Sequence, residues 1–146
     1  MAAKSVTHSV SLSLGTVALS LSDTQTADAD PTDFAFGTPR VGTSAEYLGR
    51  TNKTDALGDV DTTACNVLLL LRNDNAVGAG SGELKVTLNN TDPAGNDSTG
   101  NPNADIIIKP QQINLISIDQ LQDVKLCSHS GNCDLTYLAV QIGSGA

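Results

Sequence analysis

The chain has 146 residues, enough for one ordinary domain with a single hydrophobic core, and 39% of them are hydrophobic. Sixteen acidic and eight basic residues give a formal net charge of −8, and the basic residues are scattered singly. Because nucleic acids and anionic membrane surfaces are bound by clustered Lys and Arg, this distribution argues against both partners. No apolar run approaches the roughly 18 residues that a membrane-spanning helix needs.

Residues 5–22, "SVTHSVSLSLGTVALSLS", alternate apolar and polar residues, which is typical of an extended strand with one apolar face. The alternation changes parity at Gly15-Thr16, so the sequence predicts a bulge or a tight turn there. The strand before it is either an arm that lies on a neighbouring subunit or the first half of a hairpin. The candidate partner-contact residues of this segment are Val6, Val10, Leu12 and Leu14. A signal-peptide core is continuously apolar rather than interrupted by serine, so we expect synthesis in the cytoplasm.

Residues 23–62 are expected to be rich in loops. The stretch "DTQTADADPTD" (23–33) is acidic and loop-like, and two short strands at 34–40 and 45–50 are broken by Gly37, Pro39 and Gly42. Residues 51–62 form another polar connection. Cys65, which follows it, has the character of a small buried hydrophobe.

Residues 63–146 are expected to hold the main strands. The continuous apolar run "CNVLLLLRN" (65–73) predicts a central strand covered on both faces. Further strands are predicted at 83–89, 105–110, 112–119, 123–127 and 133–143, with a long surface loop rich in Asn, Asp, Gly and Pro at 90–104. About eight to ten short strands and no amphipathic helix predict one all-β domain over residues 1–146, an antiparallel β-sandwich or jelly roll.

Cys127, His129 and Cys133 form the densest group of chemically versatile residues. A closed zinc site would need a fourth ligand and a shorter spacing between the thiolates, and a redox cysteine would need a cationic setting. The segment "SHSGN" (128–132) instead predicts a five-residue hairpin loop that joins strands 123–127 and 133–143. The two cysteines would then face each other across the hairpin, either as a disulfide or as two free thiols.

Other kinds of site are weakly supported. Asp28, Asp30 and Asp33 and the acidic loop at 90–105 offer oxygen ligands for calcium, but they lack the spacing of an EF-hand loop, and solvated loops are the default interpretation. Only two histidines are present, and no glycine-rich loop precedes a helix, so we predict no catalytic site, no cofactor and no metal site. A glycan-binding module is the main alternative among sandwich proteins, although the chain has no Trp and only Tyr47 and Tyr137 as tyrosines.

The C-terminal half resembles small virion proteins of tailed bacteriophages. The similarity covers roughly residues 65–142 and consists of a strand before a "P-x-x-x-x-L-x-I" strand, a "DV-x-L" strand, a Ser/Gly-rich hairpin and a final "L-x-Y-L" strand. It is carried by hydrophobic positions and includes no catalytic residue. The matching residues are Pro110, Ile113, Leu115, Ile118, Asp123, Val124, Leu126, Ser130, Gly131, Leu135, Tyr137 and Leu138.

This resemblance implies a head decoration or cement protein, often trimeric, that stabilises the junctions between capsomers. The expected partners are the major capsid protein and further copies of this chain, and the expected location is the capsid surface of a virion. The alternative is a β-sandwich module of a phage fibre or adhesin that binds a glycan or a host surface. The cysteines stand where the pattern shows polar or small residues, so a disulfide would be particular to this protein.

Overall fold

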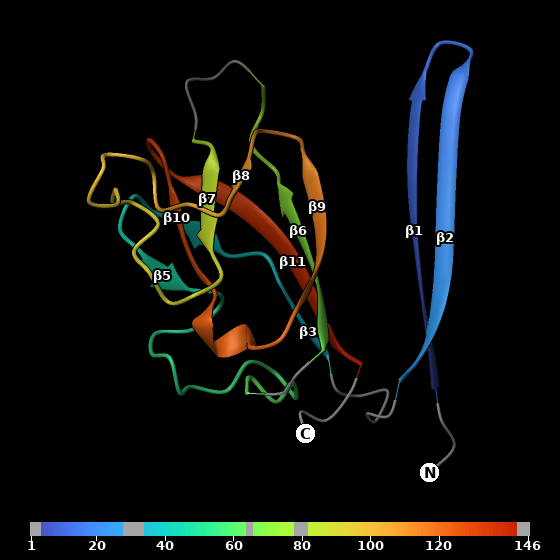
Figure 1. Ribbon diagram of the computed structural model, residues 1–146, viewed down its shortest axis with the longest axis horizontal. Helices are drawn as coiled ribbons and strands as arrows, with labels where there is room; N and C mark the ends of the chain where they lie inside the picture. The colour runs from blue at the N-terminus through green and yellow to red at the C-terminus, as the bar shows by residue number, and fades with distance from the viewer. Residues whose placement is uncertain (1–3, 28–33, 64–65, 78–81, 143–146) are drawn as a thin grey trace.

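Figure 1 shows the computed structural model of the chain, which describes residues 4–27, 34–63, 66–77 and 82–142. These ranges contain eleven strands and one short 3₁₀ helix. All strand pairs are antiparallel, and they form an N-terminal hairpin and two sheets that pack as a sandwich. The predicted all-β antiparallel sandwich is therefore confirmed.

The larger sheet of the sandwich has five strands in the order β3-β11-β6-β9, with β4 also paired to β11. Its strands are β3 (Phe34–Gly37), β4 (Arg40–Val41), β6 (Val67–Asn73), β9 (Ile113–Ile118) and β11 (Cys133–Gln141). The smaller sheet has four strands in the order β5-β10-β7-β8. Its strands are β5 (Glu46–Tyr47), β7 (Leu84–Thr87), β8 (Ile106–Ile108) and β10 (Lys125–Ser128), and the helix η1 (Leu121–Asp123) leads into β10.

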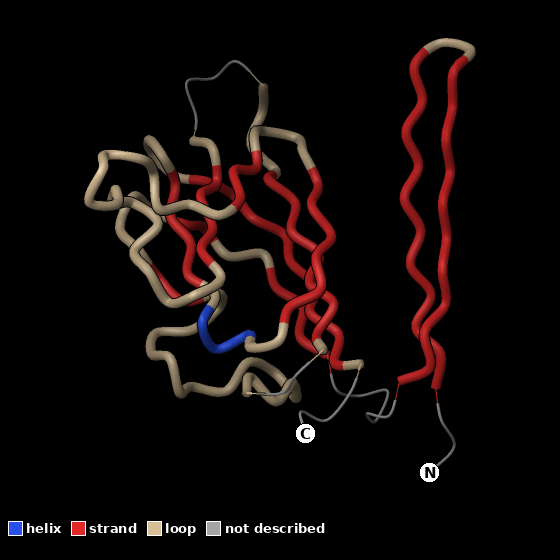
Figure 2. Tube along the Cα trace, viewed as in Figure 1, coloured by secondary structure: helices blue, strands red, loops and turns tan. Residues whose placement is uncertain are grey.

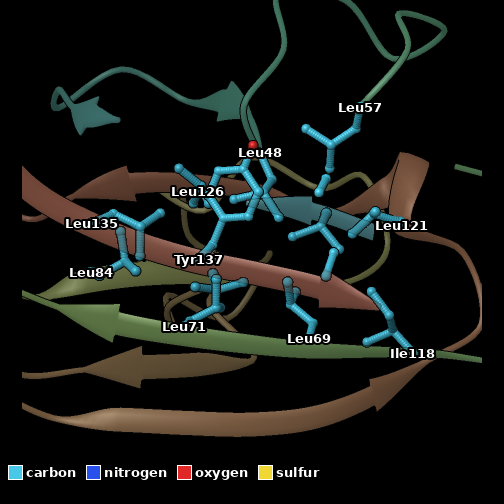
Figure 3. Packing of buried hydrophobic residues seen from close by; sticks show 14 of the residues in the cluster. Leu48, Leu57, Leu69, Leu71, Leu84, Ile118, Leu121, Leu126, Leu135 and Tyr137 are labelled. Carbon is cyan, nitrogen blue, oxygen red and sulfur yellow. The ribbon is translucent and has the colours of Figure 1, made fainter. Parts of the chain in front are cut away.

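The hydrophobic core lies between these two sheets. Alternate residues of β6, which are Val67, Leu69 and Leu71, point inward and are fully buried, as are Leu84 and Val86 of β7. Figure 3 shows how leucines from both sheets, together with Tyr137 of β11, fill this space. The continuous apolar run therefore forms a strand in the middle of a sheet, as predicted. Its inner face lies in the core, and on the other face, also predicted to be covered, Leu68 is buried, Leu70 is half-buried and Arg72 is exposed.

The N-terminal hairpin stands beside the sandwich as a separate two-stranded sheet (Figure 2). It consists of β1 (Lys4–Leu14) and β2 (Val17–Ala27), and Leu14 pairs with Val17 across a two-residue loop. Gly15 has a φ of +58°, the left-handed conformation that such a loop requires at its first position. The parity change at Gly15-Thr16 is thus a tight turn, and the hairpin alternative is confirmed.

The extent of β2 corrects one predicted boundary. Residues 23–27 were predicted to be loop, but they continue β2 because they pair with Lys4–His8 of β1. The predicted acidic residues Asp28, Asp30 and Asp33 lie outside the described residues, and so does Cys65. Within the described residues, neither β1 nor β2 pairs with a strand of the sandwich.

The predicted hairpin between strands 123–127 and 133–143 is wrong. β10 pairs with β5 and β7 in the smaller sheet, whereas β11 pairs with β3, β4 and β6 in the larger one. Residues 129–132 therefore cross from one sheet to the other. The amide of Ser128 donates to the carbonyl of Gly42 and that of His129 to the carbonyl of Glu83, so other segments take the backbone hydrogen bonds that a hairpin would have made.

Candidate functional site

The most unusual feature of the molecule is the apolar side of the N-terminal hairpin. Because β1 and β2 pair with Leu14 opposite Val17, the two alternating series point to the same side. We call this surface the hairpin face. It consists of Val6, Val10, Leu12, Leu14, Val17, Leu19 and Leu21. Val6 is half-buried, and the other six side chains are 54% to 84% exposed.

The reverse side of the same hairpin is polar. Its cross-strand pairs include Thr7 with Thr24, Ser9 with Ser22 and Ser11 with Ser20. The Thr7 and Thr24 hydroxyls are hydrogen-bonded at 3.0 Å, which is an ordinary arrangement for a solvent-facing sheet surface. The hairpin is therefore amphipathic, and its apolar side is the one left uncovered. An isolated two-stranded hairpin is only marginally stable in water unless its apolar side is packed against something.

A second apolar surface lies on the larger sheet of the sandwich, on the side opposite the core. The register places two rows of side chains across β9, β6, β11 and β3 there. We call this surface the outer face. Its apolar members are Phe34, Phe36, Leu68, Leu70, Leu115, Leu138 and Val140. Ser117 is the only polar residue in the two rows, whereas the exposed side of an antiparallel sheet is ordinarily polar.

The two phenylalanines are the most exposed members of the outer face. Phe34 and Phe36 on β3 are 47% and 62% exposed, whereas Leu70, Leu115, Leu138 and Val140 are half-buried and Leu68 is buried. Burying one side chain of this size contributes roughly 1.5–3 kcal/mol. A partner that covered Phe34 and Phe36 would therefore gain free energy by excluding water from them.

Grooves separate the hairpin of the chain from its own outer face. One of about 190 Å³ is lined by residues 6–9 of β1 and by outer-face residues including Leu68, Leu70 and Leu138. Another of about 560 Å³ is lined by residues 9–12 and by Leu70, Ile113 and Leu115 among others. Residues of both parities of β1 line them, which means that β1 presents its edge to the sandwich. Figure 1 shows the same arrangement, with β1 between the sandwich and β2.

The base of the hairpin carries its only cross-strand pair of two titratable residues among positions with described side chains. His8 lies opposite Asp23, in line with the apolar rows. The His8 side chain is half-buried, it lines the smaller groove, and its Nδ1 is enclosed without a hydrogen-bond partner among the described residues. The base is thus the part of the hairpin closest to the sandwich, and the aliphatic rows toward the turn are the part that projects.

The two cysteines of the predicted loop are separate thiols. Cys127 lies in β10 next to the core residue Leu126, Cys133 begins β11, and both cysteines are buried and free. Burial raises the pKa of both thiols, to about 11 for Cys133, where the carboxylates of Asp134 and Asp74 act in the same direction. The sequence left a disulfide and two free thiols as alternatives, and the structure has two free thiols. His129, between them in sequence, is exposed.

The two tyrosines are not displayed as a binding platform. Tyr137 is 6% exposed and lies over Gly37 and Gly49, where an added Cβ would come within 2.6 Å of its ring or hydroxyl. Tyr47 is half-buried, donates a hydrogen bond to Asn90, and has the Lys125 ammonium 4.9 Å from its ring centre. Neither tyrosine therefore presents a flat exposed ring, and the glycan alternative gains no support from them.

The described acidic loop is tied by internal hydrogen bonds. The Asp97 carboxylate accepts hydrogen bonds from the amide and hydroxyl of Thr99 and from the amide of Asn101, which lowers its pKa to about 2. These bonds use the oxygen atoms that a calcium ion would need. In the described part of the chain, no three His, Cys, Asp or Glu side chains come together in a way that would hold a metal ion. The described helix is also far too short to cross a membrane.

The structure places the four predicted contact residues on one surface, and it adds further residues to that surface. Val6, Val10, Leu12 and Leu14 share the hairpin face with three residues of β2. The outer face was not predicted, because its members come from strands far apart in sequence. The signal for it was the absence of alternation in 67–71, where Leu68 and Leu70 are apolar on the side away from the core.

No protein family, curated protein or solved structure is detectably similar to the chain.

Proposed function

We propose that this chain is a non-enzymatic structural protein of a virus particle, a decoration or cement protein that binds the major capsid protein and acts as a homotrimer at capsomer junctions. The observation that carries the proposal is the exposure of apolar side chains on two uncharged surfaces of a small sandwich: six residues of the hairpin face, and Phe34 and Phe36 of the outer face. Apolar patches of this kind mark contact sites with other macromolecules.

Several features suit a contact protein. A chain with a net charge of −8 repels further copies of itself, and its uncharged faces are the places where another subunit can approach closely. The outer edge of β2 carries backbone groups that no other described strand pairs, so it can accept a neighbour's strand. Several weak contacts made at once by a cyclic oligomer would add up to firm attachment on a capsid.

The sequence resemblance supports the virion part of the proposal. It rests on the hydrophobic positions of residues 65–142, which here form β6 to β11 of the sandwich. The resemblance also implies a hairpin before the last strand, and this chain has a crossing between two sheets there instead. The two apolar faces therefore support the proposal more strongly than the hairpin part of the resemblance does.

The proposal is tested in virions made by the virus that carries this gene. Mass spectrometry of purified particles should detect the chain in fixed proportion to the major capsid protein. Particles from a deletion of the gene should release their genome at a lower temperature, and supplying the wild-type chain in trans should restore the original temperature. A chain that lacks residues 1–27 serves as the second arm, and we expect it to restore the temperature less well.

Two results would overturn the proposal: absence of the chain from purified particles, or its presence with no effect of the deletion on genome release. A glycan array with the purified chain addresses the alternative function. A clear glycan hit that Tyr47→Ala abolishes would favour a host-binding module.

A further inference from the structure

We propose that the hairpin face of one copy covers the outer face of a second copy of this chain. This inference rests on the proposed function in one respect, since it names the second copy as the partner through which the homotrimer forms. It concerns the chain by itself and requires no capsid.

Neither surface is fully covered within one chain. The hairpin approaches its own sandwich through the edge of β1, and grooves of about 190 Å³ and 560 Å³ remain between them. The six projecting side chains of the hairpin face stay 54% to 84% exposed in this arrangement. Within one chain the hairpin face therefore stays in water, and the outer face is only partly covered, with Phe34 and Phe36 left exposed.

The two surfaces match in size. Three aliphatic rows of the hairpin face extend from Val10 and Leu21 to Leu14 and Val17, a length of roughly 14 Å at the usual rise per residue. The outer face crosses four strands, and three spacings between strands also give roughly 14 Å. Each surface contributes seven apolar side chains. Two sheets that pack face to face bury such rows against each other as a second core.

The electrostatics favour this pairing of surfaces. Two copies of charge −8 repel each other through their polar surfaces, whereas the two rows of the outer face carry no charged residue. Arg72 lies one row beyond, opposite Ile113, and is paired with Asp74. On the hairpin face, His8 and Asp23 lie at the base, away from the turn. The middle and the tip of the hairpin can therefore dock without burying a charge.

The pairing also determines the kind of assembly. The hairpin face and the outer face are different surfaces. Each copy therefore places its hairpin face on one neighbour and has its outer face covered by another. A contact of this kind is heterologous, and it forms a closed ring when the rotation between copies allows it. In a ring of three copies, every hairpin face would cover the outer face of the next copy.

Cross-linking between two differently tagged copies tests the inference. Both copies carry Cys65→Ser to remove one background thiol, and the other two cysteines are buried. One copy carries Leu19→Cys on the hairpin face, and the other carries Leu138→Cys on the outer face. The two are produced together in the same cells, purified through both tags in succession, and oxidised. We expect a covalent dimer that contains both tags.

The matched control moves the hairpin cysteine to the opposite side of the same strand. Ser20 is adjacent to Leu19, is also exposed, and points to the polar side of the hairpin. With Ser20→Cys in place of Leu19→Cys, the yield of mixed dimer should fall at least tenfold. Leu115→Cys, on β9, provides a second outer-face position and should cross-link to Leu19→Cys as Leu138→Cys does.

Three outcomes would overturn the inference. One is cross-linking of Leu19→Cys to itself but not to the outer face, which would mean that two hairpins pair. Another is a cross-link that forms only within a chain carrying both cysteines, and a third is a monomer in light scattering at all concentrations tested. Because these measurements use the purified chain alone, the contact can be present although virions lack the protein, and the two proposals fail separately.

Discussion

Leu69 illustrates what a single residue contributes to the sandwich. It lies on the inner side of β6, has no exposed surface, and packs in the middle of the hydrophobic core (Figure 3). We expect Leu69→Ala to lower the free energy of unfolding by about 2–5 kcal/mol, because the deleted methyl groups leave a cavity that the sheets cannot close. Urea denaturation followed by circular dichroism measures the change.

Leu12→Ala is the control for that substitution. Leu12 is 76% exposed on the hairpin face, so its truncation in monomeric protein should change the free energy of unfolding by no more than about 0.5 kcal/mol. Equal effects of the two substitutions would contradict the burial that separates them.

The free thiols give a second prediction at this scale. Because burial raises the pKa of Cys133 to about 11, only about one molecule in a thousand carries the thiolate at pH 8. In a Cys65→Ser protein, we expect no reaction of the folded chain with Ellman's reagent within an hour. Two thiols per chain should react after unfolding in guanidinium chloride. Release of no thiol after unfolding would indicate a disulfide between Cys127 and Cys133.

Some buried polar residues had no recognisable signal in the sequence. Arg50 is 9% exposed and donates hydrogen bonds to the carbonyls of Leu48, Lys53 and Leu121. Asn73 donates to the carbonyls of Gly82 and Ile108 and thereby joins the two sheets. A basic or amide residue in a polar stretch is ordinarily exposed, so only the packed structure shows that these two hold segments together.

At the scale of elements, the loop that joins β7 to β8 is tied together by short-range bonds. The Asp97 carboxylate, whose ordinary pKa is near 3.8, has its pKa lowered to about 2 because Thr99 and Asn101 donate hydrogen bonds to the ionised form. A lowered pKa means that these bonds are fully present above about pH 4 and are lost as the pH falls through about 2. We expect the amide signals of Thr99 and Asn101 to shift with a midpoint near 2 in an NMR titration.

Asp97→Asn provides the check on this assignment. The neutral amide does not titrate, so the transition near pH 2 at Thr99 and Asn101 should disappear in the variant. A midpoint near 3.8 in the wild-type protein would show that the hydrogen bonds of Asp97 do not form in solution.

The connection between β10 and β11 shows where local patterns mislead. Two alternating strands separated by a short loop with glycine are the usual signal for a hairpin. Here both strands have better partners elsewhere, since β10 lies between β5 and β7 and β11 lies between β3 and β6. Backbone hydrogen bonds are nearly the same for any pair of strands, so side-chain burial decides which strands pair.

For the whole molecule, the separate hairpin leads to a prediction about deletion. The described strands of the hairpin share no backbone pairing with the sandwich, and the core consists of residues from Ala35 onward. We expect a chain without residues 1–27 to fold, with a thermal midpoint in dilute solution within a few degrees of the full-length value. Light scattering of the same sample should show a monomer at concentrations where the full-length chain is oligomeric.

The two readouts separate folding from association. A shortened chain that no longer melts cooperatively would show that the hairpin is part of the folding unit. A shortened chain that is still oligomeric would show that contacts other than the hairpin face hold the copies together. Adding salt should strengthen association of the full-length chain, because it screens the repulsion between copies of charge −8.

The sequence by itself determined the fold class, the positions of most strands, and the apolar side of the hairpin. These are local properties, because the period of side-chain direction in a strand is two, and because Gly15 permits the tight turn. The tertiary structure alone decided that Cys127 and Cys133 lie in different sheets and that the apolar residues of β3, β6, β9 and β11 form one outer face. Both facts depend on pairing between strands distant in sequence, which no local pattern records.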